Sequence, residues 1–438
     1  MTASPVPAAA PGFSAMRQAA GWLFVLLALL LPAGGAARAQ SAMPTLERAP
    51  AERKSIRDNH VGIVTGLPGG IYAQLGADML RLLDDRKGQT LRLSALIGAG
   101  SVNNLDDLNN LPGVSLAILQ GDVMEAYAAE PQFRWLQGNI RYVGRLHTEV
   151  LHLVSRRDVM AGGGGTVCAL AGRRINVGGL GSGTAITVRK VLNDMLGLGV
   201  TLDTAASSEA FDQLAGRSID AMAYVVGRSA PFFSRDRVPE RFANDGLDWM
   251  SLPRSVLEQG CGGRPPRVSR DATVYEDVTL TDADYPQLIA AGQGVPTIGV
   301  PAVLAAYRFD SAGSLRAKAT SAFIDRLLSR AADPAMGLGA AGRGFDRNWC
   351  GVDLAAPVRV WQRHEAAERW LVGNATAATP RPTLIACAPA RPVPLYCQSD
   401  AAKAAEFNRR LGAAGRQLAP NDPAYLGEFA RFVQRECP

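Results

Sequence analysis

The sequence predicts an α/β protein with parallel sheets, because a unit of strand, glycine-containing turn and helix occurs three times. In each copy, a run of strand-forming residues leads into a turn and then into apolar residues at helical spacing. The copies span residues 61–83, 91–108 and 174–196. In open parallel sheets, ligands bind at the carboxyl ends of strands, where these turns lie. We therefore expect a crevice lined by backbone N–H groups and a ligand that carries carboxylates.

The remaining elements follow from the same patterns. After a strand at 114–118, Asp122 is placed to cap a helix that begins at Val123. The extended apolar segment 141–155 is expected to cross from one lobe to the other, and segment 295–307 to return the chain. Further expected elements are a strand at 219–226 and helices at 315–328, 401–411 and 423–435, whereas residues 227–285 stay unassigned.

The amino terminus has the pattern of a cleaved signal peptide. Arg17 precedes an apolar core at residues 22–31, and a small-x-small cleavage site at 37–39 follows it. The core is shorter than the roughly 20 residues that span a bilayer. We expect residues 1–39 to direct export to the periplasm and residues 40–59 to form a polar leader.

Composition indicates a globular chain. Of its 438 residues, 47% are hydrophobic and 20% are charged, with a formal net charge of +6. Basic residues do not gather into runs with interleaved aromatic residues, so nucleic acid is not an expected partner.

Six cysteines in an exported chain favour disulfides. Cys387 and Cys397 are close in sequence and are the easiest pair to propose. By elimination, the others would pair as Cys350 with Cys437 and Cys168 with Cys261, although sequence alone leaves the connectivity open. No C-x-x-C motif occurs, which argues against a thioredoxin-like or zinc-ribbon role.

The glycine turn at 178–184 does not fit the familiar catalytic or nucleotide-binding loops. A Walker loop needs Lys after its last glycine, but Thr184 and Ala185 follow Gly183. The glycine offsets of a dinucleotide fingerprint are absent, and Leu180 stands where a nucleophile elbow around Ser182 needs glycine. The turn therefore indicates either an anion site at a helix start or an ordinary tight turn.

Several polar side chains have both a functional and a structural interpretation. His147, Glu149 and His152 have the residue types of metal ligands but do not share one face of an extended segment, so we expect no metal site. Arg145 suits a ligand carboxylate, although an ordinary ion pair is the more common role. Tyr72 would either cover the pocket or pack in the core, and Asp122 fits a cap better than a ligand contact.

The four histidines are His60, His147, His152 and His364, and none falls in a catalytic pattern. We therefore expect no catalytic residues, no cofactor and no enzyme activity.

Taken together, the motifs resemble the TAXI family, the solute receptors of tripartite (TRAP-type) transporters. The resemblance covers roughly residues 60–370 and rests on the order and spacing of several stretches. They are Gly66-Leu67-Pro68-Gly69-Gly70-Ile71-Tyr72, Gly100-Ser101-Val102-Asn103-Asn104-Leu105, Leu119-Gln120-Gly121-Asp122, the run from Leu170 to Gly178 that leads into Gly181-Ser182-Gly183-Thr184, Ile219-Asp220-Ala221, Tyr285-Pro286 and Val295-Pro296-Thr297-Ile298-Gly299-Val300.

The resemblance implies a two-lobed (type II) periplasmic binding protein that closes on a small acidic solute, such as glutamate, 2-oxoglutarate or another dicarboxylate. It would deliver the solute to TRAP-type permease subunits. Lobe 1 would span 60–148 and 271–372, and lobe 2 would span 149–270. Residues 373–438 lie outside the resemblance, and their Pro and Cys content predicts a small disulfide-braced extension. The implied ligand-binding residues are Thr65, Gly69, Gly70, Tyr72, Ser101, Asn104, Gln120, Asp122, Ser182, Gly183 and Thr184.

The tail and the unassigned segment 227–285 keep a second interpretation open. It is a periplasmic ligand-binding sensor or scaffold of the same fold that acts with a signalling partner instead of a permease.

Overall fold

The computed structural model describes residues 50–436, with gaps that are given at the end of this paragraph. The predicted signal peptide and the leader up to residue 49 lie outside the described residues, and the last part of the leader forms helix α1 (Pro50–Asp58). None of the described helices is long and apolar enough to cross a membrane. The gaps are residues 86–89, 163, 234–237, 263–265, 267–273, 334–336, 339–343, 376–384, 386–396, 398–399 and 421.

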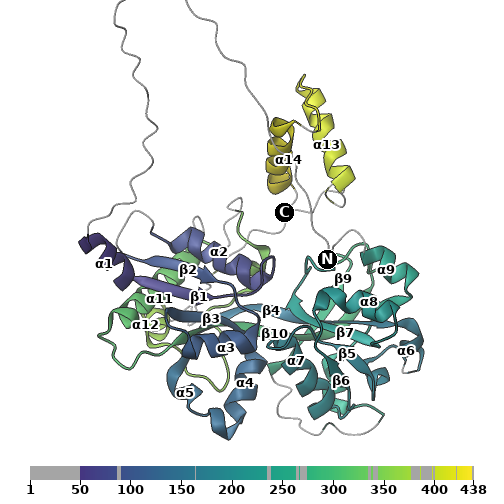
Figure 1. Ribbon diagram of the computed structural model, residues 1–438, viewed down its shortest axis with the longest axis horizontal. Helices are drawn as coiled ribbons and strands as arrows, with labels where there is room; N and C mark the ends of the chain where they lie inside the picture. The colour runs from purple at the N-terminus through teal and green to yellow at the C-terminus, as the bar shows by residue number, and fades with distance from the viewer. Residues whose placement is uncertain are drawn as a thin grey trace, which may run out of the picture. The chain divides into compact units, whose positions relative to one another are not determined.

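Two parallel groups of strands form the two lobes, as the sequence predicts (Figure 1). Lobe 1 is built on β1 (His60–Val64), β2 (Arg92–Leu96) and β3 (Val114–Gln120), with β1 between the other two. Lobe 2 is built on β5 (Arg174–Asn176), β6 (Thr201–Asp203) and β7 (Ala221–Gly227), with β5 in the middle.

Two long antiparallel strands join the lobes. Strand β4 (Ile140–Arg156) pairs with β10 (Gly294–Tyr307) over its first half and with β7 over its second half. Strand β10 pairs with β3 at its end and with β9 (Glu276–Thr281) at its start. These are the two segments that the sequence predicts as crossings. Their central residues therefore lie where the lobes meet.

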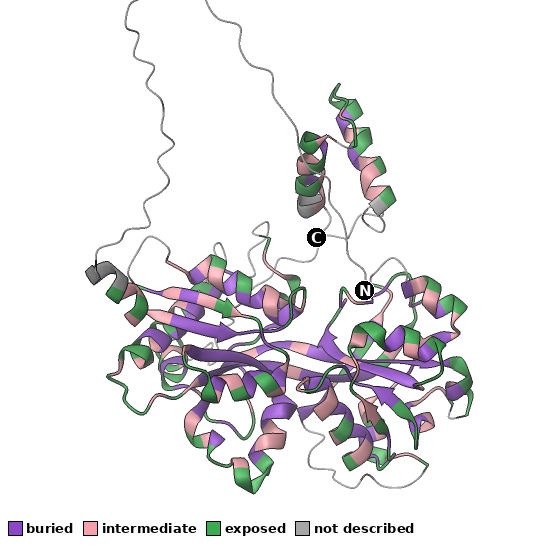
Figure 2. Ribbon diagram, in the orientation of Figure 1, coloured by how far each residue is buried: buried purple, intermediate pink, exposed green. Residues whose placement is uncertain are grey.

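Helices cover the strands of lobe 1, and their apolar faces are buried while their outer faces are exposed (Figure 2). Helix α2 (Ile71–Leu83) buries Leu75, Met79 and Leu83 at helical spacing. The other helices of this part are α3 (Ser101–Asn110), α4 (Gly121–Ala129), α5 (Leu136–Asn139), α11 (Leu315–Ala331) and α12 (Glu365–Asn374), with short 3-10 turns at Pro131–Phe133 and Arg347–Gly351.

In lobe 2, the helix that the sequence predicts after residue 184 has two parts. It begins as α7 (Gly183–Val188) and continues as a π-helix (Arg189–Met195), in which the Leu196 N–H donates to the Val191 carbonyl at 3.0 Å. Val188, Val191, Leu192 and Met195 are buried, as the spacing predicts. The remaining elements are α6 (Arg157–Ala161), α8 (Ala210–Ala215), α9 (Val238–Asn244), β8 (Leu247–Trp249), α10 (Arg254–Gln259) and 3-10 turns at Val167–Leu170 and Ser207–Glu209.

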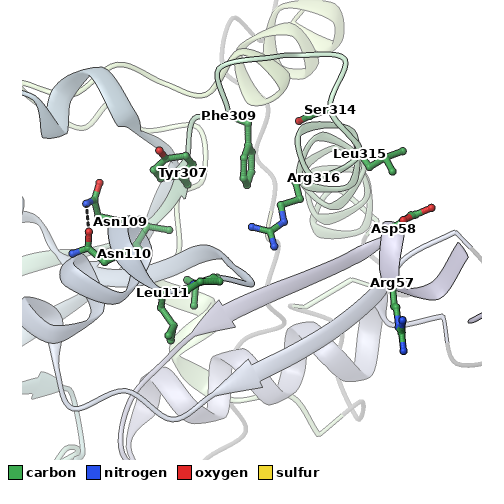
Figure 3. Close-up of a pocket in the computed structure, with 13 residues that line it drawn as sticks. Arg57, Asp58, Asn109, Asn110, Leu111, Tyr307, Phe309, Ser314, Leu315 and Arg316 are labelled. Carbon is green, nitrogen blue, oxygen red and sulfur yellow. Dashed lines mark hydrogen bonds between the residues drawn. The ribbon is translucent and has the colours of Figure 1, made fainter. Parts of the chain in front are cut away.

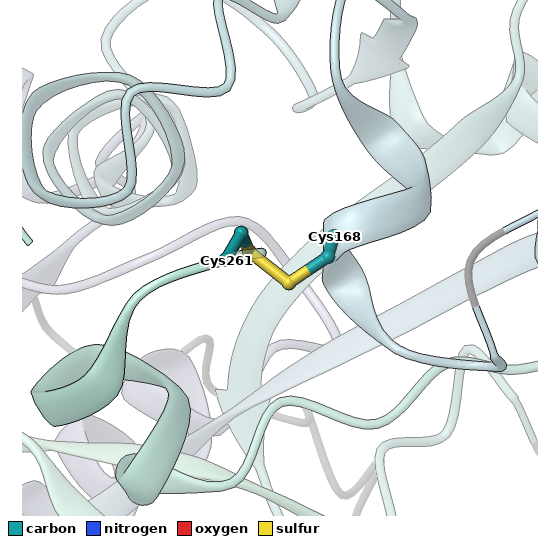
Figure 4. The surroundings of a disulfide bond; sticks show 2 residues. All are labelled: Cys168 and Cys261. Carbon is teal, nitrogen blue, oxygen red and sulfur yellow. A yellow bond between two sulfur atoms is a disulfide. The ribbon is translucent and has the colours of Figure 1, made fainter. Parts of the chain in front are cut away.

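The disulfide between Cys168 and Cys261 is present and braces lobe 2 (Figure 4). Cys350 and Cys397 are also disulfide-bonded. Cys387 and Cys437, their predicted partners, lie outside the described residues. At the carboxyl terminus, α13 (Asp400–Ala413) and α14 (Pro423–Glu436) pack on each other through Phe407, Leu411, Tyr425 and Phe432.

Candidate functional site

Glycine turns from the two lobes meet directly. The Val102 N–H at the start of α3 donates to the Gly181 carbonyl at 3.1 Å. The backbones are so close that a Cβ added to Gly100 would lie 2.9 Å from the Ser182 Cα. Thus the turns that follow β2 and β5 lie against each other, as expected if both face one interlobe site.

The hydroxyl groups of the predicted site mainly brace their own turns. Thr65 Oγ1 donates to the Leu96 carbonyl at 2.8 Å, and Ser101 Oγ accepts from the Gln120 N–H at 3.0 Å. In lobe 2, Ser182 caps α7 by accepting from the Ala185 N–H, and Thr184 Oγ1 accepts from the Val225 N–H at 3.0 Å. These side chains therefore position the turns of the two lobes.

The helices of lobe 1 start without side-chain caps at one edge of the sheet. Gly70, Gly100 and Gln120 are the N-cap residues of α2, α3 and α4. The two glycines have no side chain, and the Gln120 side chain does not accept a hydrogen bond from the helix. Each helix follows a parallel strand directly, so the three starts share the carboxyl edge of β1, β2 and β3. Uncapped N–H groups and the helix dipoles favour an anion at this edge.

Asp122 joins the lobes. The prediction that it caps a helix beginning at Val123 is wrong, because α4 begins at Gly121 and Asp122 lies in its first turn. Thr187 Oγ1 of α7 donates to Asp122 Oδ2 at 2.6 Å, and the Tyr275 hydroxyl donates to the same oxygen at 3.1 Å. Lys190 lies 3.6 Å from Glu125 beside this contact. Sequence reasoning missed Thr187 and Tyr275, whose distance along the chain hides the contact.

A second buried carboxyl group lies in the crossing strand β4. The Tyr72 hydroxyl donates to Glu149 Oε2 at 2.6 Å, and the side chain of Gln120 also hydrogen-bonds to Glu149. Burial, helped by the Asp122 carboxyl, raises the pKa of Glu149 to about 8 against the effect of both hydrogen bonds. Glu149 therefore carries a proton at neutral pH.

The His147 ring packs edge-on against Tyr72, with 6.2 Å between the ring centroids. Burial lowers the pKa of His147 to about 3, so the ring is neutral, and neither of its nitrogens has a hydrogen-bond partner among the described residues. His152 lies apart from this pair. Its Nε2 is 2.7 Å from the Tyr285 hydroxyl, among Phe233 and Trp249. In the sequence, the only sign of these buried polar groups was that His147 and Glu149 interrupt an otherwise apolar strand.

Three buried acceptors at the interlobe contact have no partner in the described part of the chain: Asn104 Oδ1, Gln120 Oε1 and Asp122 Oδ1. Leaving one such atom unsatisfied costs about 1–3 kcal/mol. The amide nitrogen of Asn104 is bonded to the Thr65 and Ile118 carbonyls, which fixes its oxygen. Unpaired acceptors at the predicted site indicate that a guest supplies the donors.

Arg145 and Gly69 have structural roles. Arg145 pairs with Glu276 at 2.7 Å, the ordinary ion pair that the sequence favoured over a ligand contact. Gly69 has a φ of 80°, which only glycine adopts readily, so it shapes the turn before α2.

Of two hollows in the described surface, one lies away from this cluster and the other borders the contact between Val102 and Gly181. One of about 570 Å³ is lined by Tyr307, Phe309 and Arg316, at the start of β3 and of α11 (Figure 3). Gln120 stands at the opposite end of β3, so this hollow is not the predicted site. Another, of about 500 Å³, is lined by Trp135 and Asn103 of lobe 1 and by Leu180 of lobe 2.

The sequence profile of the NMT1-like family matches residues 63–312, from β1 to just beyond β10. No curated protein sequence matches the chain significantly. Solved structures that resemble it include XAC2383 from Xanthomonas citri bound to ATP (12% identity over 70% of this chain and 93% of that chain, TM-score 0.37). Another is PhnD1 from Prochlorococcus marinus with methylphosphonate (10% identity over 62% of this chain and 85% of that chain, TM-score 0.35). A third is a TRAP periplasmic solute-binding protein from Shewanella oneidensis with succinate (11% identity over 61% of this chain and 77% of that chain, TM-score 0.33).

Proposed function

Because the chain belongs to the NMT1-like family, we propose that it is an extracytoplasmic receptor whose two lobes close on a small acidic solute. The observation that carries this proposal is the meeting of the α3 turn with the α7 turn around buried, unpaired polar atoms. The uncapped starts of α2, α3 and α4 support a carboxylate as one recognised group. Closure would exclude water and strengthen these contacts.

Gly183 offers a direct test of closure. A Cβ at this position would lie 1.7 Å from Gln120 Oε1, and Gln120 is itself buried and bonded to Glu149. Gly183→Ala should therefore hold the lobes apart and weaken solute binding by about 10-fold or more, the loss of roughly one good hydrogen bond. Calorimetric titration with the solute that native mass spectrometry finds in the purified protein measures the effect.

Gly179→Ala is the matched control. Gly179 belongs to the same turn, but an added Cβ would meet no atom within 4 Å. The Gly179→Ala variant should bind the solute with the same affinity as the wild type. Equal affinities for all three proteins would show that closure at Gly183 plays no part in binding.

The membrane partner follows from the sequence resemblance, which implies delivery to TRAP-type permease subunits. Cross-linking the receptor in whole cells and identifying the captured membrane protein tests this part. Capture of permease subunits supports transport, and capture of a sensor kinase would instead support the signalling alternative.

A further inference from the structure

The interlobe contact contains two buried acidic side chains, which is unexpected for a site that takes a plain dicarboxylate. Glu149 and Asp122 are 4% and 0% exposed. No ion pair joins Glu149 or Asp122 to a cation in the described ranges. Asp122 accepts from the Thr187 and Tyr275 hydroxyls and from the Val123 backbone N–H, while Lys190, which pairs with Glu125, acts on it through its charge alone. A second carboxylate of a bound dianion would add a third acidic group beside these two, in a medium of low dielectric where neighbouring carboxylates ionise together only at a high cost in free energy.

We propose that Glu149 and Asp122 bind a protonated amino group of the solute, so that the receptor selects acids that also carry an amine. This inference rests on the proposed function, because it assigns the second end of the same solute. The carboxylate would occupy the uncapped helix starts of lobe 1, and the ammonium group would face β4 and the start of α4.

The unpaired atoms favour this chemistry. Asn104 Oδ1, Gln120 Oε1 and Asp122 Oδ1 are all acceptors, and an ammonium group supplies three donors and no acceptor. A keto group or a carboxylate supplies acceptors alone, so it would leave the same atoms unpaired. Gln120 connects the two acids, because it bonds to Glu149 and stands two residues before Asp122.

The charges around Glu149 agree with this assignment. Tyr72 faces it from α2, Asp122 from α4 and His147 from β4 itself, and the His147 ring is neutral. None of these groups supplies a positive charge. An ammonium group beside Glu149 would favour the carboxylate form, so binding at pH 7 should release a proton from Glu149.

Matched pairs of probes test the proposal on the full mature chain. Each pair has one carbon skeleton and differs only in an amino or a 2-oxo group: glutamate with 2-oxoglutarate, aspartate with oxaloacetate, and leucine with 4-methyl-2-oxopentanoate. We expect at least one amino member to bind about 10- to 100-fold more tightly than its 2-oxo partner, the range of one charge-assisted hydrogen bond. Calorimetry in two buffers of different ionisation enthalpy should also show proton release.

Glu149→Gln supplies the second arm. This variant keeps the size and a hydrogen-bonding group but removes the charge, so it should lose most of the preference for the amino member and the proton release. A 2-oxo acid that binds as tightly as its amino partner overturns the inference and leaves the receptor function standing. If no probe binds and no solute is retained on purification, both proposals fail.

Discussion

Glu149→Gln is expected to raise the free energy of unfolding by about 3 kcal/mol at pH 7. The pKa of Glu149 is about 8 in the folded protein and 4.5 in a model peptide, so the folded state holds a proton that the unfolded state releases. Each pH unit above 4.5 therefore costs the wild type about 1.4 kcal/mol, until the loss levels off near pH 8. The glutamine variant does not titrate and escapes this loss.

Two buried histidines make the free energy of unfolding rise with pH below pH 6.5, the opposite of the effect of Glu149. Burial lowers the pKa of His147 to about 3 and of His152 to about 4, so both take up protons only on unfolding. Together they outweigh Glu149, and these three groups place the maximum of wild-type stability near pH 6.5. Glu149→Gln should keep the loss of stability on the acid side and remove the loss on the alkaline side.

Chemical denaturation between pH 5 and pH 8.5 measures both slopes. Glu258→Gln is the control, because Glu258 forms an exposed i,i+4 pair with Arg254, and such pairs contribute about 0.5 kcal/mol or less. A glutamine variant at position 149 with the same alkaline slope as the wild type would show that Glu149 is ionised in the folded protein. If the glutamine variant is more stable, Glu149 lowers the stability of the wild type, as expected of a residue that is kept because it binds the solute.

The elements of the fold were predictable because their signals are local. Apolar periodicity placed α2 and the buried face of the helix that starts at Gly183, and extended apolar runs identified β4 and β10 as crossings. The sequence also placed the glycine turns at the ends of strands, and the turns before α3 and α7 lie in contact. The division of one predicted helix into α7 and a π-helix went unseen, since the sequence spacing is the same for both. Helices α1, α9, α10 and α12 and strands β8 and β9 were not predicted either.

The acidic pair was not predictable, because its meaning comes from contacts between distant residues. Glu149 bonds to a tyrosine 77 positions away, and Asp122 bonds to one 153 positions away. Locally, Asp122 has the pattern of a helix cap, and Glu149 has the pattern of a metal ligand beside two histidines. Only the tertiary contacts distinguish a buried carboxyl group that can accept a further hydrogen bond from a helix cap or a metal ligand.

Replacing both Cys168 and Cys261 by alanine should lower the free energy of unfolding by about 4–5 kcal/mol. The bond links residues 93 positions apart, and closing a loop of that length removes much of the conformational freedom of the unfolded chain. Both cysteines are only partly buried, so alanine leaves little cavity and the loss comes mainly from the unfolded state.

Denaturation of the double variant, with the disulfides at Cys350 and Cys397 left intact, isolates this one bond. Solute affinity should stay unchanged, because the bond joins the Val167–Leu170 turn to the segment after α10, and neither of these belongs to the interlobe contact. A loss below about 1 kcal/mol would mean that segment 168–261 is already restrained in the unfolded chain. Loss of affinity at full stability would instead mean that the bond holds lobe 2 in the shape that closes on lobe 1.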